Sequence, residues 1–540
     1  MQHKLSIYIP LIFAVLLAMG MALGFKMYES IKGKQKVSAA GFMSKGGNTP
    51  LDEILNYVQA KYVDTVDTEN FLDEALNGVL HDLDPHSSYI SPNELSDVEE
   101  SLQGNFDGIG VEFSIIDDTI NVITPIAGGP SESVGIRAGD KIVKIEDSSA
   151  VKLKNEQVIK KLRGEKGSKV AVSVKRGGVK DLIDFTITRN KIPIVSVDVA
   201  YMIDQHTAYI KVNRFSEKTY EEFRDKLSEM KQKGATKLIL DLRQNPGGYL
   251  DAAVEMADEF LPGQGMIVYT EGRVSKRDER KAGREGIFEN GEVAVLIDEG
   301  SASASEIVSG ALQDWDRATI IGRRSFGKGL VQEQYPLKNG GALRLTVARY
   351  YTPTGRSIQK DYGKGYEAYE KELAERYEDG ELEHPDSLPK TKTDTSKVYK
   401  TLIKGRKVYG GGGIMPDIAI PIEKYASAFS ARARSVVPQF VYSYYSQHTS
   451  DFEQYANVDN FDKNFTISNQ LFDAYKQTLK KELKFIDEKQ LNSERSELEN
   501  YMKALFARQL WSNNGYYPII NKTDKAMQRA YNELNVVAKK

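Results

Sequence analysis

The stretch from Val293 to Gln332 constrains this chain more than any other. The apolar run from Val293 to Ile297 predicts a buried strand, and a Gly-Ser-Ala segment follows it. Apolar residues then recur at the spacing of a helix: Ile307, Val308, Ala311, Leu312 and Trp315. A serine in the turn between strand and helix lies beside helix amides that have no intrahelical partner. Those amides and the helix dipole can stabilise an oxyanion, so the pattern favours a nucleophilic serine.

Three serines occupy this turn, and a lysine follows in a second turn rich in glycine. Ser301, Ser303 and Ser305 also fit the plain role of small residues at a helix start. Lys328 lies between two glycines, which allow the backbone to approach another surface closely. A lysine can replace histidine as the base for a serine where burial lowers its pKa enough to leave it neutral. An exposed Gly-Lys-Gly hairpin without chemistry is the alternative.

These residues closely resemble the C-terminal processing, or tail-specific, serine peptidases. That family carries a Ser-Ala-Ser-Ala-Ser/Ala-Glu motif, then a Gly-Lys-Gly motif, and in many members a glutamine four residues after the lysine. Ser303, Lys328 and Gln332 match the three positions. The resemblance covers roughly residues 50 to 425 and includes three further segments: Asp241 to Gly248, Leu345 to Gly355, and Gly413 to Asp417.

The resemblance implies covalent peptide hydrolysis by a Ser-Lys dyad, with no metal and no cofactor. Lys328 would take the proton of Ser303 and later protonate the leaving amine, and Gln332 would orient Lys328. Two kinds of supporting residue also follow from the family: the oxyanion-hole donors Gly248 and Ala304, and the structural carboxylates Glu306 and Asp314. The opposite reading is an inactive scaffold that only binds protein tails, and the intact dyad argues against it.

Other chemistries fit the sequence less well. A net charge of −3, with Lys and Arg spread along the chain, gives no case for nucleic-acid binding. The absence of cysteine excludes a thiol nucleophile and disulfides, and the zinc-protease motif H-E-x-x-H is missing. The run from Gly322 to Lys328 resembles a phosphate-binding loop, but Gly329 replaces the required Ser or Thr. A Ser-His-Asp triad remains open, although none of the six histidines lies in a glycine-rich turn.

A second pair of motifs predicts a PDZ domain. Gly108-Ile109-Gly110-Val111 resembles the carboxylate-binding loop of that domain, and Gly135 to Ile142 resembles its Gly-Asp strand entry. Backbone amides of such a loop capture a C-terminal carboxylate while the peptide adds a strand to the sheet edge. The expected partners are therefore proteins or peptides with free, apolar C-termini. The oligomeric state is left open.

The N-terminal segment predicts membrane attachment. Leu5 to Phe25 is free of charge and long enough to span a bilayer. Small residues at Ala18, Gly20 and Ala22 keep a cleaved signal peptide as the alternative. Lysines after the segment outnumber those before it, which would keep the following chain cytoplasmic. The family resemblance implies the opposite orientation, and we therefore expect an inner-membrane anchor with a periplasmic body.

The chain is expected to be a multidomain α/β protein, because strands alternate with helices from residue 193 onward. The family implies a crotonase-like ββα peptidase core, an inserted-type PDZ domain, and helical regions at both ends. The expected parts are an anchor or signal (1–25), a linker (26–49), an N-terminal helical region (50–103), the PDZ domain (104–192), the peptidase core (193–424, with a charged insertion at 359–407) and a C-terminal helical region (425–540).

Overall fold

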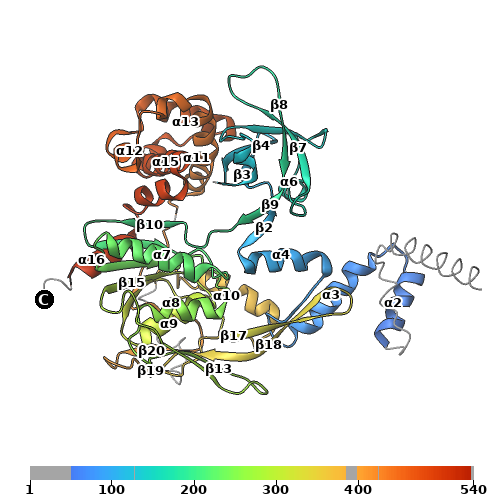
Figure 1. Ribbon diagram of the computed structural model, residues 1–540, viewed down its shortest axis with the longest axis vertical. Coiled ribbons are helices and arrows are strands. Elements are labelled where there is room, and N and C mark those ends of the chain that lie inside the picture. The colour runs from blue at the N-terminus through green and yellow to red at the C-terminus, as the bar shows by residue number, and fades with distance from the viewer. Residues whose placement is uncertain (1–49, 127, 385–397, 424, 537–540) are drawn as a thin grey trace, which may run out of the picture. The chain divides into compact units, whose positions relative to one another are not determined.

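The computed structural model describes residues 50–126, 128–384, 398–423 and 425–536 (Figure 1). The expected membrane segment (1–25) and linker (26–49) lie outside these ranges. Within them, no helix is both long and apolar enough to cross a membrane. The chain divides into two compact units, one of residues up to Asn93 with Gln334–Arg344, the other of Glu94–Glu333 with Leu345 onward.

The first unit contains the two helices expected near the start of the described chain. These are α2 (Pro50–Lys61) and α3 (Thr68–His81), and the Asp67 side chain caps α3 by accepting from the backbone of Glu69 and Asn70. The short strand β1 (Ser88–Ile90) follows and pairs antiparallel with Ala342–Arg344, the first residues of β18 (Ala342–Tyr351).

The second unit is organised around a six-stranded sheet with the order β10-β11-β12-β15-β16-β21. Only β10 runs antiparallel to its neighbour. The strands are β10 (Val199–Met202), β11 (Thr207–Lys211), β12 (Lys237–Asp241), β15 (Glu292–Ile297), β16 (Ala318–Gly322) and β21 (Ile418–Ala419). The central strands are continuous apolar runs because the parallel sheet is covered on both faces.

Two hydrophobic clusters show how this sheet is covered. Leu238 and Leu240 of β12 point into the cluster formed with three helices, whereas Ile239 between them points into the cluster formed with a single helix. The three helices are α7 (Thr219–Gln232), α8 (Leu250–Asp258) and α9 (Ala304–Asp314), and the single helix is α16 (Lys525–Val536). The predicted α/β layers are therefore present, with α9 as the helix that begins at the candidate nucleophile.

A second sheet and the charged insertion complete the core. Strand β13 (Met266–Glu271) pairs antiparallel with β14 (Asp278–Lys281) and with Arg349–Tyr351 of β18. Strand β17 (Leu330–Pro336) pairs with β18. The insertion contains a helix and a hairpin: α10 (Tyr366–Glu378), β19 (Val398–Lys400) and β20 (Lys407–Tyr409).

The PDZ region follows α4 (Pro92–Gln103). A ribbon of β2 (Asn105–Gly108) and β9 (Asn190–Pro193) joins its two ends. Between them lies a sheet of order β3-β4-β5-β7-β8, with β6 paired to β5. Its elements are β3 (Val111–Ile116), β4 (Thr119–Pro125), α5 (Pro130–Ser133), β5 (Lys141–Ile145), β6 (Ser148–Ser149), α6 (Asn155–Leu162), β7 (Lys169–Lys175) and β8 (Ile183–Thr188).

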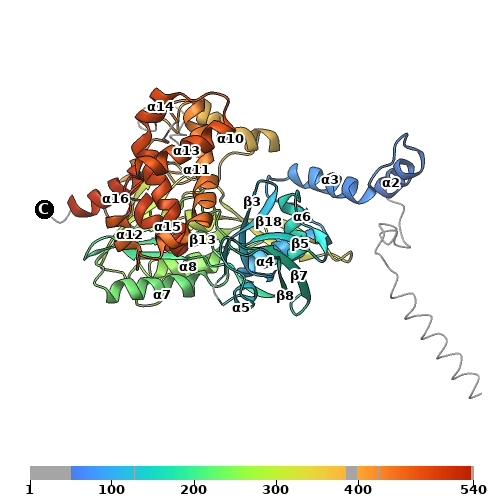
Figure 2. The ribbon, with the colours of Figure 1, turned by 90° about the horizontal axis from the view of Figure 1, so that it is seen from above.

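The C-terminal region is helical, as the sequence predicts, and its Tyr and Phe side chains form a hydrophobic cluster of their own. The helices are α11 (Ala428–Gln447), the 3₁₀ turn η3 (Thr449–Phe452), α12 (Val458–Asn464), α13 (Asn469–Glu482), α14 (Glu488–Ser493) and α15 (Arg495–Ile520), followed by α16 (Figure 2). The backbone of α15 is broken at Trp511 and Ser512.

Candidate active site

Ser303 lies in the turn between β15 and α9, as the sequence predicts. The strand ends at Ile297 and the helix begins at Ala304, with Ser303 as its N-cap residue. The backbone of Ser303 has φ 53° and ψ −112°. Few residues other than glycine adopt positive φ, and such strain persists only where the surrounding structure enforces it. The turn therefore presents this serine, rather than its neighbours, in a special conformation.

Two glycines form the surface against this turn. A Cβ on Gly247 would lie 2.8 Å from the Cβ of Ser303 and 2.7 Å from the carbonyl oxygen of Ala302. A Cβ on Gly248 would lie 1.9 Å from the carbonyl oxygen of Phe215. Both glycines also have positive φ, so only residues without a side chain fit here. The loop after β12 is thus packed directly against the backbone of the candidate nucleophile.

The predicted oxyanion-hole residues lie on the two sides of this contact. Gly248 belongs to the loop after β12, and Ala304 is the first residue of α9. Among the described residues, no hydrogen bond uses the backbone N–H of either residue. Asn245 ties the two segments together, because its carbonyl oxygen accepts from the amide of Ala302 (3.0 Å) and the hydroxyl of Ser305 (2.9 Å).

Glu306 is fully buried and links the serine turn to the lysine loop. Its Oε2 accepts from the amides of Ser303 and Lys328, both at 2.8 Å. Its Oε1 accepts from the hydroxyl of Ser325 at 2.5 Å and the amide of Gly327 at 2.8 Å. Burial raises the pKa of Glu306 to about 7, although these hydrogen bonds act in the opposite direction. One carboxyl group thus fixes the backbone of both candidate catalytic residues.

Lys328 and Gln332 are brought together as the sequence predicts. The Nζ of Lys328 donates to the Oε1 of Gln332 at 3.2 Å, and both side chains are partly buried. Gln332 is the third residue of β17, whereas Lys328 lies in the loop just before that strand. The predicted orienting contact between Gln332 and Lys328 is therefore present.

Tyr350 is a site residue to which the sequence analysis assigned no role. Its buried hydroxyl lies within hydrogen-bonding distance of the carbonyl oxygen of Ser303, at 3.1 Å, and of the carbonyl oxygen of Lys328. Burial raises the pKa of Tyr350 well above its ordinary value, so the hydroxyl remains a donor. The only sequence signal is its position in the family-like segment from Leu345 to Gly355.

Asp314 supports a different part of the core. Its Oδ1 pairs with Nη2 of Arg356 at 2.8 Å, and both side chains are fully buried. Its Oδ2 accepts from the amide and hydroxyl of Thr354, at 3.0 and 2.7 Å. Asp314 therefore holds the turn after β18, and its role is structural.

Part of the charged insertion is buried against the loop that carries Lys328, although its composition is typical of a solvent-exposed segment. Arg376 of α10 is 4% exposed and donates to the carbonyl oxygens of Arg324 (2.8 Å) and Ser325 (3.3 Å). Arg324 pairs with Glu381 just after α10, at 2.6 Å. The insertion thus packs against the loop that carries Lys328. Composition concealed this role because the charges that suggest solvent exposure are here buried in pairs.

The predicted carboxylate loop connects β2 to β3. Ile109 is buried in the core of the PDZ region, and its carbonyl oxygen accepts from the hydroxyl and amide of Ser131, at 2.6 and 3.0 Å. Gly110 has φ +71°, and its carbonyl oxygen accepts from the amide of Ile126. Among the described residues, the backbone N–H groups of Ile109 and Gly110 take part in no hydrogen bond. Hydrogen bonds within the protein thus fix the carbonyl groups of Ile109 and Gly110, whereas their N–H groups point to a role in binding a ligand.

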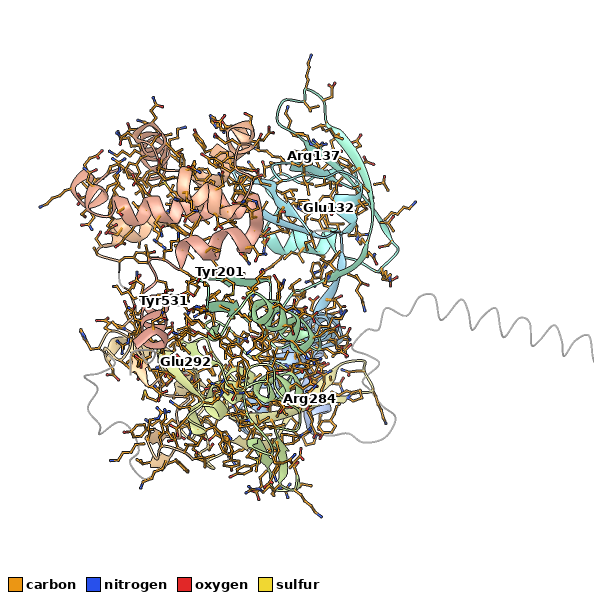
Figure 3. All side chains as sticks on the ribbon, turned by 60° about the vertical axis from the view of Figure 1, so that its left-hand side comes forward. Glu132, Arg137, Tyr201, Arg284, Glu292 and Tyr531 are labelled. Atoms are coloured by element: carbon orange, nitrogen blue, oxygen red, sulfur yellow. The ribbon has the colours of Figure 1, made fainter. Side chains whose placement is uncertain are left out.

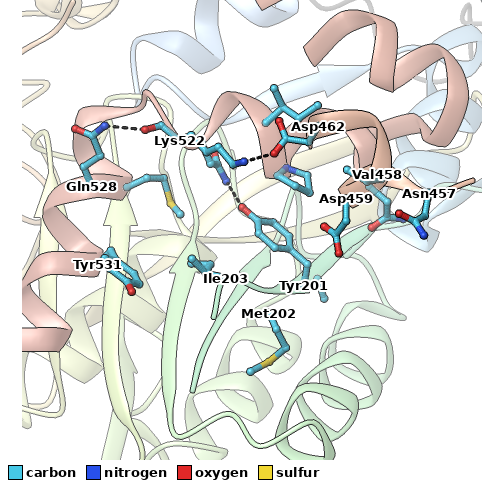
Figure 4. A pocket seen from close by; sticks show the side chains of 16 residues that line it. Tyr201, Met202, Ile203, Asn457, Val458, Asp459, Asp462, Lys522, Gln528 and Tyr531 are labelled. Atoms are coloured by element: carbon cyan, nitrogen blue, oxygen red, sulfur yellow. Dashed lines mark hydrogen bonds and ion pairs between the residues drawn. The ribbon is translucent and has the colours of Figure 1, made fainter. Parts of the chain in front are cut away.

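A separate cavity of about 650 Å³ lies between β10 and the C-terminal helices, and no predicted site residue lines it. Tyr201 accepts from the amide side chain of Asn521 at 3.0 Å, and Lys522 pairs with Asp462 (Figure 4). Tyr531 of α16 also lines this cavity and is labelled just below Tyr201 in Figure 3.

Three family descriptions match parts of the chain. Residues 206–366 match peptidase family S41, and residues 108–187 match the PDZ domain. Residues 429–512 match a family of unknown function, DUF8443.

Parts of the chain are also similar to individual proteins. A carboxy-terminal-processing protease of Bartonella bacilliformis is 40% identical over 312 residues, which cover 57% of this chain and 71% of the relative. The carboxy-terminal processing protease CtpA of Bacillus subtilis is 29% identical over 444 residues, covering 82% and 90%. The PDZ domain of a carboxy-terminal protease from Vibrio cholerae, solved with a peptide, is 30% identical, with a TM-score of 0.16, and covers 16% of this chain and 97% of that one.

Proposed function

Since this chain belongs to the carboxy-terminal processing proteases of peptidase family S41, we propose that it cleaves proteins with a Ser303–Lys328 dyad and selects them by their free C-terminal tails. The predicted family and the predicted serine-peptidase activity are confirmed by the relatives. We propose two things beyond the family: that Ser303 and Lys328 form the catalytic dyad, and that the PDZ region selects substrates by their free C-terminal tails, which we call the reading of tails.

The main support for the dyad is that two side chains, Glu306 and Tyr350, each contact both the turn that contains Ser303 and the loop that contains Lys328. Glu306 bonds the amides of Ser303 and Lys328, and the Tyr350 hydroxyl lies between their carbonyl groups. Two buried groups therefore fix the relative positions of these two backbones. Such positioning is what a nucleophile and its base require.

The reaction proceeds in two halves. The neutral amine of Lys328 takes the hydroxyl proton of Ser303 as Oγ attacks the scissile carbonyl carbon, and the protonated lysine then gives this proton to the leaving amine nitrogen. Water next attacks the acyl-enzyme, Lys328 takes a proton from it, and that proton returns to Oγ as the ester bond breaks. The N–H groups of Gly248 and Ala304 hold the oxyanion in both halves, and Gln332 holds the amine in place.

The carboxylate loop supports the reading of tails. The N–H groups of Ile109 and Gly110 have no other use among the described residues, and β3 directly after them has β4 as its only strand partner there. A free carboxylate on these amides would align the preceding residues along the open edge of β3. An apolar last residue would pack towards the core around Ile109.

A gel assay with an unfolded protein substrate tests both parts. The wild-type protein should degrade it and Ser303→Ala should not, whereas equal inactivity of both would favour the scaffold alternative. Amidation of the substrate's C-terminus should slow cleavage, because it removes the charge that the amides would hold. Equal rates for amidated and free-acid tails would refute the reading of tails and leave the dyad untouched.

The location of the enzyme is proposed from the sequence alone. Residues 1–25 would anchor it in the inner membrane with the body in the periplasm, and the homo-oligomeric state is left open. This expectation rests on residues outside the described ranges.

A further inference from the structure

The C-terminal helical region lies against the strand along which a substrate tail would bind. Arg508 of α15 pairs with Glu112 of β3, with Nη2 and Oε1 2.7 Å apart. The hydroxyl of Tyr442 on α11 donates to the carbonyl oxygen of Val122 on β4 at 3.3 Å, and Tyr442 is buried. These contacts hold α11 and α15 beside the β3–β4 hairpin.

A cavity of about 460 Å³ lies between these helices and β3. Every residue from Glu112 to Asp117 lines it, together with members of the two helices. Neighbouring side chains of a strand point to opposite faces, so a cavity that touches each residue in turn runs along an edge of the strand. One edge of β3 is occupied by β4. Strand β4 contributes only Ile123 to the printed lining, so the cavity lies mainly beside β3, over its outer face and towards the edge where an added tail would bind.

The two faces of β3 offer different surroundings. Val111, Phe113 and Ile115 pack against the core of the PDZ region. Glu112 and Ser114 alternate with them and face the other way. A tail paired with β3 would show the same alternation, with every second side chain pointing away from the PDZ core. Those side chains would meet the helices instead of open solvent.

The wall made by the helices has an unused hydrogen-bond acceptor. Gln509 of α15 lines the cavity, and its Oε1 is buried and has no hydrogen-bond partner among the described residues. A buried acceptor without a partner is costly, and a donor from a ligand would remove that cost. The charges of Glu112 and Arg508 compensate each other, whereas the carboxylate of Asp117, which also lines the cavity, would repel an added negative charge. The acceptor of Gln509 calls for a hydrogen-bond donor, and Ser, Thr, Asn or Gln supplies one without the cost of taking a charge out of water.

From these contacts we infer that α11 and α15 form a second specificity wall for the bound tail, which selects Ser, Thr, Asn or Gln through Gln509 at one of the tail positions whose side chains point away from the PDZ core. The inference rests on the proposed reading of tails by the PDZ region. It assigns a role in substrate selection to the part of the chain that matches a family of unknown function.

The test measures tail binding to the full chain carrying Ser303→Ala, which prevents cleavage. The probes are fluorescent apolar peptides with a free C-terminus, in which each tail position in turn is Ala, Ser or Asn. Ser and Asn should bind more tightly than Ala by about 2- to 10-fold, the value of one neutral hydrogen bond, and only at one position, whose side chain points away from the PDZ core. Gln509→Leu should abolish this difference and leave the affinity for the all-apolar peptide within about 2-fold.

The matched control is Gln454→Leu, which makes the same change at an exposed glutamine outside the cavity. It should keep the preference at the same tail position. Ser114→Trp provides a second variant, since a large ring on this exposed position of β3 would fill the cavity and weaken binding of every peptide. An equal preference for Ser and Asn at neighbouring tail positions, or a preference that survives Gln509→Leu, would overturn the inference. Amidated peptides separate the two proposals: equal binding of amidated and free-acid tails refutes both, whereas a free-acid preference without any preference for Ser or Asn refutes the second wall alone.

Discussion

Replacing Glu306 by Gln should inactivate the enzyme while leaving it folded. The four hydrogen bonds to Glu306 come from the amides of Ser303, Gly327 and Lys328 and the hydroxyl of Ser325, two to each carboxyl oxygen. Glutamine has one oxygen and one NH₂ group, so two of these four donors would face another donor. Each buried donor that loses its acceptor lowers the free energy of unfolding by about 1–3 kcal/mol, so two such donors lower it by about 2–6 kcal/mol.

A second effect opposes this loss. Burial raises the pKa of Glu306 from 4.5 to about 7. In the native state the group therefore holds its proton up to a higher pH than in the unfolded state. Stability from this group is greatest below pH 4.5, falls as the pH rises from 4.5 to about 7, and is constant above that. At 1.36 kcal/mol for each unit, the shift amounts to about 3 kcal/mol, which glutamine avoids above pH 7.

The two effects partly offset each other at pH 8, where Glu306→Gln should change the stability by between a gain of about 1 kcal/mol and a loss of about 3 kcal/mol. Activity should nevertheless fall by about 100-fold or more, because the displaced amides belong to Ser303 and Lys328 and misplacement by about 1 Å has effects of that size. Urea unfolding at pH 5 and pH 8 measures the stability, and peptide hydrolysis measures the activity. The exposed Glu285→Gln is the matched control.

The stability of Glu306→Gln relative to wild type should rise from pH 5 to pH 8. Only the wild type contains the Glu306 carboxyl group, whose contribution to stability falls over that range. A variant that keeps more than about half of the wild-type activity would refute the positioning role of Glu306. A relative stability that is the same at both pH values would refute its raised pKa.

Three further predictions concern the base, the tyrosine and the membrane. Lys328→Arg should be as inactive as Ser303→Ala in peptide hydrolysis, because a guanidinium group keeps its proton in proteins; near-normal hydrolysis by the folded variant would overturn the dyad. Tyr350→Phe should reduce kcat by about 10-fold, the value of one hydrogen bond of about 1.4 kcal/mol, with little change in KM; a rise in KM at constant kcat would instead place Tyr350 in substrate binding. The full chain should sediment with membranes and resist alkaline extraction, whereas a chain starting at Met43 should stay in the supernatant; sedimentation of both would show that residues 1–42 are not the anchor.

The sequence by itself determined the elements whose signal is local. The strand from Val293 to Ile297 and the helix after Ser303 follow from apolar periodicity, and both are present. Lys328 and Gln332 are close in sequence, so their contact could be predicted from the family motif. The family and the serine-peptidase activity were also predicted correctly, because the motifs that carry them are contiguous.

Only the tertiary structure decided which distant groups complete the site. Tyr350 and Arg376 lie far from Ser303 in sequence, and nothing in their local pattern distinguishes them from an ordinary strand tyrosine or a solvated charge. Their roles depend on which backbone carbonyl groups the folded chain brings to them. The same holds for Gln509, which faces β3 only because α15 packs against the hairpin. Periodicity reports whether a residue is buried, whereas the partner that a buried polar group finds is set by packing between segments far apart in the chain.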